Sequence, residues 1–303
     1  MQSRIDIPRE LMTERELLQP GLLSCQGCGA TLAMKFALMG LGKRTIIVIP
    51  ACCWSIIIGP YPYSALQVPV IHVPFETAAV SASGVRAALD IRGEKDVAVM
   101  AWAGDGGTFD IGLQALSGTA ERNDDIIYVC YDNEAYMNTG TQRSSATPIG
   151  AWTTTTPEGS LKEEPKKDIE KIMLAHGIPY VATASVAHPD DVVRKFQKAR
   201  GIRGTKFIHL LSPCPPGWRI DPNKSVQITR MATQAKVFPL YEVENGKYTI
   251  SLYPGKEIPV REYLKAQGRF REMNEGMVNA VQERVDRKWE DLVKLAGSVS
   301  RKA

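Results

Sequence analysis

Three short apolar runs, separated by segments with helical spacing, limit the fold of this chain most strongly. They are TIIVI at residues 45–49, VAVMAWA at 97–103 and IIYVCY at 126–131. Runs of this length that are apolar throughout are typical of strands buried on both faces of a sheet. Because helical patterns lie between them, we predict an α/β fold with a parallel sheet covered by helices on both faces.

The alternation of strands and helices continues to residue 211. Helices are predicted at 30–41, 77–91, 110–123, 168–176 and 189–200, and further strands at 180–183 and 206–211. Residues 134–160 are rich in Thr, Ser and Gly and are predicted to form a long loop. Long loops in compact domains are usually functional, and we expect residues 134–156 to line one wall of a substrate pocket.

The pattern changes at about residue 239. The sequence YEVENGKYTISLYP predicts a β-hairpin with its turn at Asn245-Gly246, and residues 274–295 predict a charged helical tail. We therefore divide the chain into an N-terminal arm (1–24), an α/β domain (25–238) and a C-terminal hairpin with a helical tail (239–303).

The composition excludes several classes of function. The net charge is +4, and the Lys and Arg residues are scattered, so we predict no nucleic-acid partner. No stretch approaches the ~18 apolar residues of a membrane helix, and the polar N-terminus is not a secretory signal. We therefore expect a cytoplasmic protein whose six cysteines are metal ligands or buried core residues rather than disulfides.

The sharpest local motif is WAGDGGTFDIG, residues 102–112, between a predicted strand and a predicted helix. Glycines at 104, 106 and 107 let the backbone approach a phosphate, and a helix N-terminus favours anions. Asp105 can offer a hard oxygen ligand to Mg²⁺. The next strand ends at Asn133, after the 26 residues 107–132, so the two strand ends are expected to be neighbours. Asp105 and Asn133 are thus predicted to share one cation that clamps a diphosphate.

A second group of candidate residues consists of cysteines near the ends of predicted elements. Cys25, Cys28, one of the pair Cys52-Cys53, and Cys214 are four candidate thiolates for Zn²⁺ or an iron–sulfur cluster. Cys130 lies in the middle of a predicted strand and is predicted to be a buried, inert thiol. His209 lies in an apolar strand and is predicted to be a core residue with satisfied hydrogen bonds.

The motif GDG followed after about 26 residues by Asn resembles the thiamine diphosphate signature. Together with CxxCG at 25–29, the cysteines at 52–53, DNEAYMNTG at 132–140 and SPCPPGW at 212–218, it resembles the β subunits of 2-oxoacid:ferredoxin oxidoreductases, with the pyruvate class most similar. The resemblance covers about residues 15–270. It implies the pyrophosphate-binding type of thiamine diphosphate fold.

The resemblance also implies roles for individual residues. Mg²⁺ ligands are Asp105, Asn133 and the backbone carbonyl of Ala135, and the turn Gly104-Asp105-Gly106, with Gly107, cradles the diphosphate. Asn138 and Thr139 face the cofactor, and Asn138 is our candidate catalytic residue. Cys25, Cys28, Cys53 and Cys214 bind a [4Fe–4S] cluster. Cys53 is preferred to Cys52 because it lies 28 positions after Cys25, which is the family spacing.

The implied reaction is oxidative decarboxylation of a 2-oxoacid such as pyruvate, a branched-chain 2-oxoacid or oxalate. Electrons pass to ferredoxin, and coenzyme A is the usual acyl acceptor. The glutamate that activates the cofactor belongs to a pyrimidine-binding domain for which this chain has no room. We therefore expect an α subunit that carries it, as well as γ and δ subunits or fused equivalents. Residues 59–75 are the predicted contact face.

Two alternatives remain at this stage. One is a non-redox thiamine diphosphate lyase or transferase subunit with a structural zinc site. The other is a non-catalytic scaffold chain that binds a metal, in which the GDGG segment is merely a turn.

Overall fold

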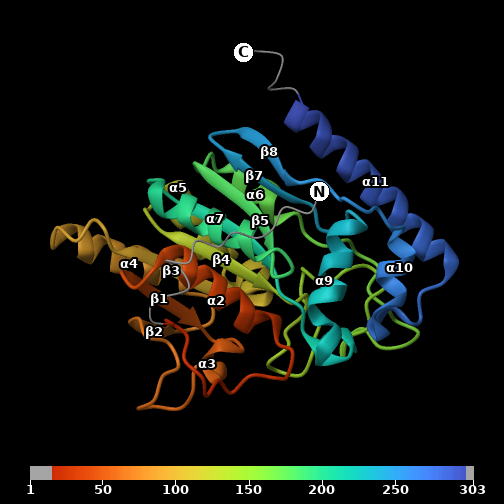
Figure 1. Ribbon diagram of the computed structural model, residues 1–303, viewed down its shortest axis with the longest axis horizontal. Coiled ribbons are helices and arrows are strands. Elements are labelled where there is room, and N and C mark those ends of the chain that lie inside the picture. The colour runs from red at the N-terminus through yellow and green to blue at the C-terminus, as the bar shows by residue number, and fades with distance from the viewer. Residues whose placement is uncertain (1–15, 298–303) are drawn as a thin grey trace.

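The computed structural model describes residues 16–297. Residues 1–15 of the predicted arm and residues 298–303 of the tail lie outside the described part. One eight-stranded sheet with the order β2-β1-β3-β4-β6-β5-β7-β8 organises the rest (Figure 1). Its strands are β1 (Thr45–Pro50), β2 (Val70–Val73), β3 (Ala98–Gly104), β4 (Ile127–Asp132), β5 (Tyr180–Ser185), β6 (Lys206–Leu211), β7 (Leu240–Glu244) and β8 (Lys247–Leu252). The strands from β2 to β5 in this order are parallel, which confirms the predicted α/β class.

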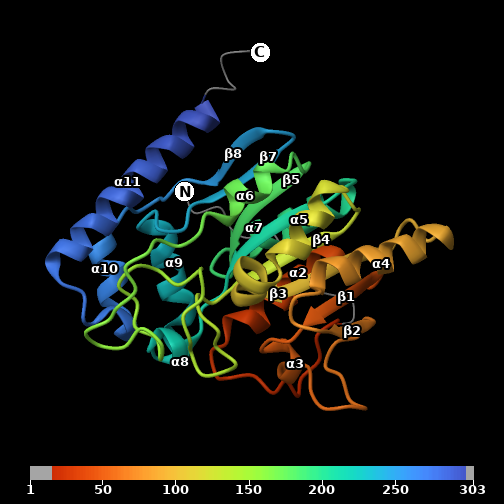
Figure 2. The same ribbon diagram turned by 180° about the vertical axis from the view of Figure 1, so that it is seen from behind.

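Helices cover both faces of the sheet (Figures 1 and 2). They are α2 (Gly29–Leu41), α3 (Trp54–Ile57), α4 (Ala78–Ile91), α5 (Leu113–Glu121), α6 (Ile169–Ala175), α7 (Pro189–Gly201), α8 (Pro215–Trp218), α9 (Ser225–Gln234), α10 (Val260–Lys265) and α11 (Glu275–Gly297). Helices α2 and α7 pack together on one face, and α4 and α5 pack together on the other. Within the described residues no helix is long and apolar enough to cross a membrane.

Alternate residues of each central strand enter the two cores. In β1, Ile47 and Ile49 pack beneath α2 and α7, whereas Val48 packs beneath α4. Strands buried on both faces need apolar residues at every position, because successive side chains point to opposite faces. This is why the apolar runs identified the strands correctly.

The predicted hairpin is confirmed, and it extends the main sheet. Strand β7 pairs antiparallel with β5, and β8 with β7. Asn245 and Gly246 both have positive φ, 49° and 80°, as a two-residue turn of the I′ type requires. The predicted tail is α11, which contacts β8 along its outer side (Figures 1 and 2).

One predicted helix differs in detail. The segment expected as a helix at 110–123 begins with a π-helical turn, η1 (Gly106–Ile111), and continues as α5 after Gly112. A wider turn of this kind is frequent at functional sites. The short elements β2, α3, η2 (Pro222–Lys224) and η3 (Gly268–Phe270), and the helices α8, α9 and α10, were not predicted. Residues 134–160 form the expected loop, with only isolated bridges.

Candidate cofactor site

A pocket of about 140 Å³ lies at the carboxyl ends of β1, β3 and β4. Ligands of open α/β sheets bind at this edge. Its lining comprises Ala51, Cys52, Cys53, Phe75, Gly104, Asp105, Gly106, Gly107, Tyr131, Asn133, Ala135, Tyr136, Met137, Asn138 and Thr139. Every residue predicted to contact a diphosphate cofactor or its metal is in this set, so the structure brings these residues together in one pocket.

The glycines of the pocket are required by close packing of aromatic rings. A Cβ atom on Gly106 would lie 2.2 Å from Cε1 of Tyr136, and one on Gly107 would lie 3.2 Å from Cε2 of Phe75. Any side chain at 106 would therefore displace Tyr136. The bare backbone that this leaves is what a phosphate needs for close approach.

Three oxygen-bearing groups converge beside these glycines. One end of the Asn133 carboxamide lies 2.9 Å from the carbonyl oxygen of Ala135 and 3.0 Å from Oδ1 of Asp105. The Asn133 amide can adopt two orientations. If its nitrogen lies at this end, it donates hydrogen bonds to both the Ala135 carbonyl and Asp105. If its oxygen lies there, three oxygens face one another, and a bound cation would satisfy all of them.

The electrostatics of Asp105 fit a cation at this point. Burial raises the pKa of the Asp105 carboxyl well above its ordinary value, and the negative charge of Asp132 raises it further. The hydroxyl of Ser144 donates a hydrogen bond to Oδ2 and opposes this rise. A divalent cation at Oδ1 would stabilise the ionised carboxylate that burial disfavours. The donor set therefore fits Mg²⁺.

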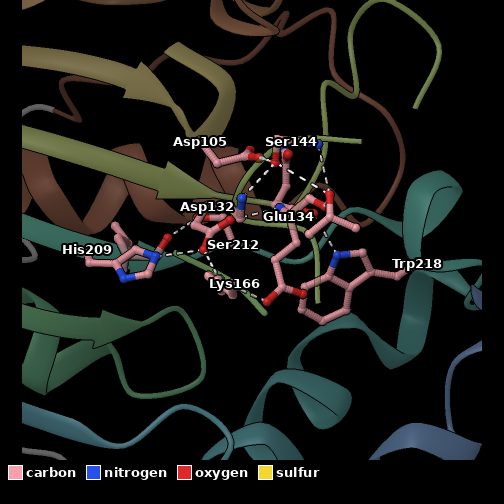
Figure 3. Close-up of polar contacts among 12 residues, drawn as sticks. Asp105, Asp132, Glu134, Ser144, Lys166, His209, Ser212 and Trp218 are labelled. Atoms are coloured by element: carbon pink, nitrogen blue, oxygen red, sulfur yellow. Dashed lines mark hydrogen bonds and ion pairs between the residues drawn. The ribbon is translucent and has the colours of Figure 1, made fainter. Parts of the chain in front are cut away.

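Behind these groups lies a network of charged side chains that are buried or, like Lys166, half-buried (Figure 3). Lys166 forms ion pairs with Asp132 and Glu134, the second at 3.0 Å. His209 on β6 points at Asp132, with Nε2 2.6 Å from Oδ2, and its Nδ1 contacts Glu170. The prediction that His209 is a buried residue with satisfied hydrogen bonds is confirmed.

The pKa values of His209 and Asp132 are set by the oppositely charged groups beside them. Burial alone would lower the pKa of His209, but Glu170 and Asp132 raise it to about 9. Burial alone would raise the pKa of Asp132, but Lys166 and His209 lower it to about 2. The network therefore holds both groups in their charged forms immediately behind Asn133.

The candidate cysteines approach one another at the same edge of the sheet. Cys28, Cys53 and Cys214 each immediately precede a helix: α2, α3 and α8. The backbone N–H of Gly29 donates to the carbonyl oxygen of Pro213 at 2.9 Å, which joins the CxxCG segment to the Cys214 segment. A Cβ atom on Gly29 would lie 2.2 Å from Cδ of Pro213, so the glycine of this motif permits the contact.

The pKa shifts of the thiols also indicate that these cysteines lie near one another, because each thiolate would affect the others. Burial raises the pKa of Cys53 to about 12, and negative charge on Cys52, Cys214 or Cys28 adds to the rise. Burial likewise raises the pKa of Cys214 to about 12, with Cys28 and Cys25 contributing. Thiolates gathered in this way are stabilised by a metal centre. In residues 16–297, however, no group of three or more His, Cys, Asp or Glu residues is placed so that it could hold a metal ion.

The other two cysteines differ from these. Cys130 is fully buried within β4, as predicted. Cys52 also lines the pocket, where it contacts the Tyr131 hydroxyl. The roles of Cys25, Cys28, Cys53 and Cys214 as cluster ligands stay predictions.

Sequence reasoning missed several residues that hold the site: Ser144, Lys166, Trp218 and Arg269. Trp218 donates from Nε1 to the carbonyl oxygen of Asn133 at 2.8 Å, and Nη2 of Arg269 donates to Glu134 at 2.6 Å. Each comes from a different segment. Trp218 ends the SPCPPGW motif, but that motif was used only for its cysteine, and the other three residues belong to no local motif.

The fold is that of a thiamine diphosphate-binding domain. Residues 54–210 match the family model described as the C-terminal TPP binding domain of thiamine pyrophosphate enzymes. A solved structure of a 2-oxoglutarate:ferredoxin oxidoreductase from Magnetococcus marinus, with 2-oxoglutarate, coenzyme A and succinyl-CoA bound, has the same fold. Its TM-score is 0.55 at 24% identity, covering 68% of this chain and 76% of that chain.

Curated relatives are much more similar in sequence. The chain is 51% identical to ketoisovalerate oxidoreductase subunit VorB of Pyrococcus furiosus, over 98% of this chain and 97% of the relative. It is also 51% identical to pyruvate synthase subunit PorB of Methanothermobacter marburgensis, over 90% of this chain and 96% of the relative. The chain therefore belongs to the β subunits of the 2-oxoacid:ferredoxin oxidoreductases, which are multi-chain enzymes.

Proposed function

We propose that this chain is the cytoplasmic β subunit of an enzyme that oxidatively decarboxylates a 2-oxoacid, with ferredoxin as electron acceptor and coenzyme A as acyl acceptor. One observation carries the proposal: Cys53 and Asp105 line the same pocket. When bound, thiamine diphosphate supplies the electron sink for loss of CO₂, and a [4Fe–4S] cluster accepts electrons one at a time.

Each group of residues has a defined task in this proposal. Asp105, Asn133 and the Ala135 carbonyl would hold Mg²⁺, because the Asp105 carboxylate, the Asn133 carboxamide and this carbonyl converge in the pocket. The bare backbone of residues 104–107 receives the diphosphate. Asn138 and Thr139 line the pocket farther along the loop and would face the cofactor.

The thiols of Cys25, Cys28, Cys53 and Cys214 hold the cluster. Their pKa pattern supports this assignment, because Cys53 is influenced by Cys214 and Cys28. Burial also raises the pKa of Cys52, but its hydrogen bonds with Tyr131, Trp54 and Ser55 oppose this rise.

The partner that completes the active site is proposed to be an α subunit with a pyrimidine-binding domain, and γ and δ subunits or fused equivalents complete the complex. The proposed contact face includes the segment 59–75. Tyr61 and Tyr63 there are 99% and 77% exposed, and Ile71 is exposed on the edge strand β2. Exposed aromatic residues of this kind are enriched in protein interfaces.

The substrate is proposed to be a 2-oxoacid of the kinds that the relatives' names state, pyruvate or ketoisovalerate. Oxalate is a third substrate to assay. The relatives with these two substrates are equally similar to the chain, so the assay must compare the acids directly.

The test uses the complex purified without oxygen. Asp105→Asn should lose bound thiamine diphosphate and Mg²⁺, while the iron content and visible absorption of the complex remain. Asp125→Asn is the matched control, because Asp125 lies at the opposite end of β4 and pairs with Lys206. Cofactor retained by Asp105→Asn, or zinc in place of iron in the wild type, would refute the proposal.

A further inference from the structure

The segment that follows Cys214 is bonded directly to the loop that carries the proposed metal ligands. We call residues 214–219 the Cys214 turn and residues 132–135 the metal loop. Trp218 is fully buried, and its Nε1 donates to the carbonyl oxygen of Asn133 at 2.8 Å (Figure 3). A residue four positions after a proposed cluster ligand therefore fixes the backbone of a proposed Mg²⁺ ligand.

Arg269 forms a second link between the same two segments. Its guanidinium group lies 4.2 Å from the centre of the Trp218 ring, and its Nη2 donates to Oε2 of Glu134 at 2.6 Å. The adjacent N–H of Gly268 donates to the carbonyl oxygen of Arg219 at 3.1 Å. Because Arg269 and Glu134 are both buried, water screens the attraction between their charges only weakly.

A third link is a packing contact. A Cβ atom on Gly217 would lie 2.1 Å from Sδ of Met137, and Met137 lines the cofactor pocket. The Cys214 turn and the wall of the pocket therefore touch with no space between them. A shift of the turn must move the pocket wall as well.

The metal loop needs such support because its backbone is strained. Glu134 has a φ of 70°, in the left-handed region that non-glycine residues seldom adopt. Between Asn133 and Ala135, this conformation turns the chain so that their oxygen-bearing groups meet. Glu134 is held there by Arg269, by Lys166 and by Thr147, whose hydroxyl donates to the Glu134 carbonyl oxygen.

We propose that Trp218 and Arg269 are positioning residues that couple the thiol site to the thiamine diphosphate site. A cluster bound at Cys214 orders the Cys214 turn, and the hydrogen bond from Trp218 then holds the metal loop in its ligand-binding conformation. By linkage, thiamine diphosphate must favour retention of the cluster by the same factor. This inference rests on the proposed function.

The experiment measures the dissociation constant of Mg²⁺–thiamine diphosphate by calorimetry, in the complex with its iron and after chelation of the iron. Removal of iron from the wild type should weaken binding about fivefold, the effect of one neutral hydrogen bond. Trp218→Phe keeps an aromatic ring beside Arg269 and removes the donor together with the pyrrole ring that carries it. Its affinity with iron present should equal that of the iron-free wild type and should not fall further when the iron is removed.

Trp102→Phe is the matched control. The Trp102 ring is fully buried and its Nε1 has no hydrogen-bond partner among residues 16–297, so this change removes the same donor atom without removing a bond seen there. It should keep the wild-type affinity and the wild-type response to iron. If Trp218→Phe does not assemble, Arg269→Gln serves instead, and it should likewise abolish the response to iron.

A fivefold response to iron in Trp218→Phe, or no response in a wild type that contains iron, would overturn the coupling. The comparison is repeated with Cys214→Ser in place of chelation, so that it does not depend on which metal the thiols bind. A wild-type enzyme without iron would refute the proposed function. The coupling would still be supported if Cys214→Ser weakened cofactor binding in the wild-type background but not in the Trp218→Phe background. It would be overturned if Cys214→Ser weakened binding equally in both backgrounds.

Discussion

His209 should make the stability of this protein depend on pH in a predictable direction. The side chain is buried between two carboxylates, Asp132 at 2.6 Å and Glu170. Burial opposes its protonation, but the two carboxylates raise its pKa from 6.5 to about 9. We consider the change His209→Gln, which keeps a polar side chain and removes the charge.

The size of the stabilisation follows from the shift in the pKa of His209. A rise in pKa from 6.5 to about 9 corresponds to about 3 kcal/mol of unfolding free energy. Because the pKa is higher in the folded state than in the unfolded state, this stabilisation is fully present below about pH 6.5. It is lost as the pH rises through about 9.

The assay is the thermal unfolding midpoint of the complex between about pH 6 and pH 10. The midpoint of the wild type should exceed that of His209→Gln most at low pH, and the difference should narrow by roughly 6 °C toward high pH. His176→Gln is the control, because His176 lies outside the proposed contact face 59–75 and forms hydrogen bonds but no ion pair in the described part of the chain. A difference that stays constant across this pH range would refute the reasoning.

Three further changes test other parts of the site. Lys166→Met removes the cation shared by two buried carboxylates and should lower the unfolding free energy by about 3–5 kcal/mol in urea titrations; a loss below about 1 kcal/mol would contradict this. Gly29→Ala places a methyl group against the rigid ring of Pro213 and should reduce the iron bound per chain; full iron content would show that the contact is dispensable. Cys130→Ala should leave iron content unchanged, since this thiol is buried within β4, and iron loss would disprove the assignment of ligands.

The sequence predicted the central sheet because its strands are buried on both faces. A strand of this kind is apolar at every position, and that pattern is visible in a few adjacent residues. The proximity of Asp105 and Asn133 was also predictable, because neighbouring parallel strands end at the same edge of a sheet. In the structure their side chains approach within 3.0 Å.

Short or exposed elements were not predictable in the same way. Strand β2 has only four residues and two of them are exposed, so it has no continuous apolar run. Helix α8 has four residues and contains two prolines. The π-helical turn at Gly106–Ile111 has the same residue pattern as the start of an ordinary helix.

The sequence by itself determined the class of fold, the glycine turn at residues 104–107 and the candidate thiols, because each of these is recorded in adjacent residues. Only the tertiary structure decided what holds them in place. Lys166, His209, Trp218 and Arg269 come from separate segments and meet behind Asp132–Ala135. Each contributes one side chain to a contact between distant parts of the chain, and such a contact leaves no periodic pattern in the sequence.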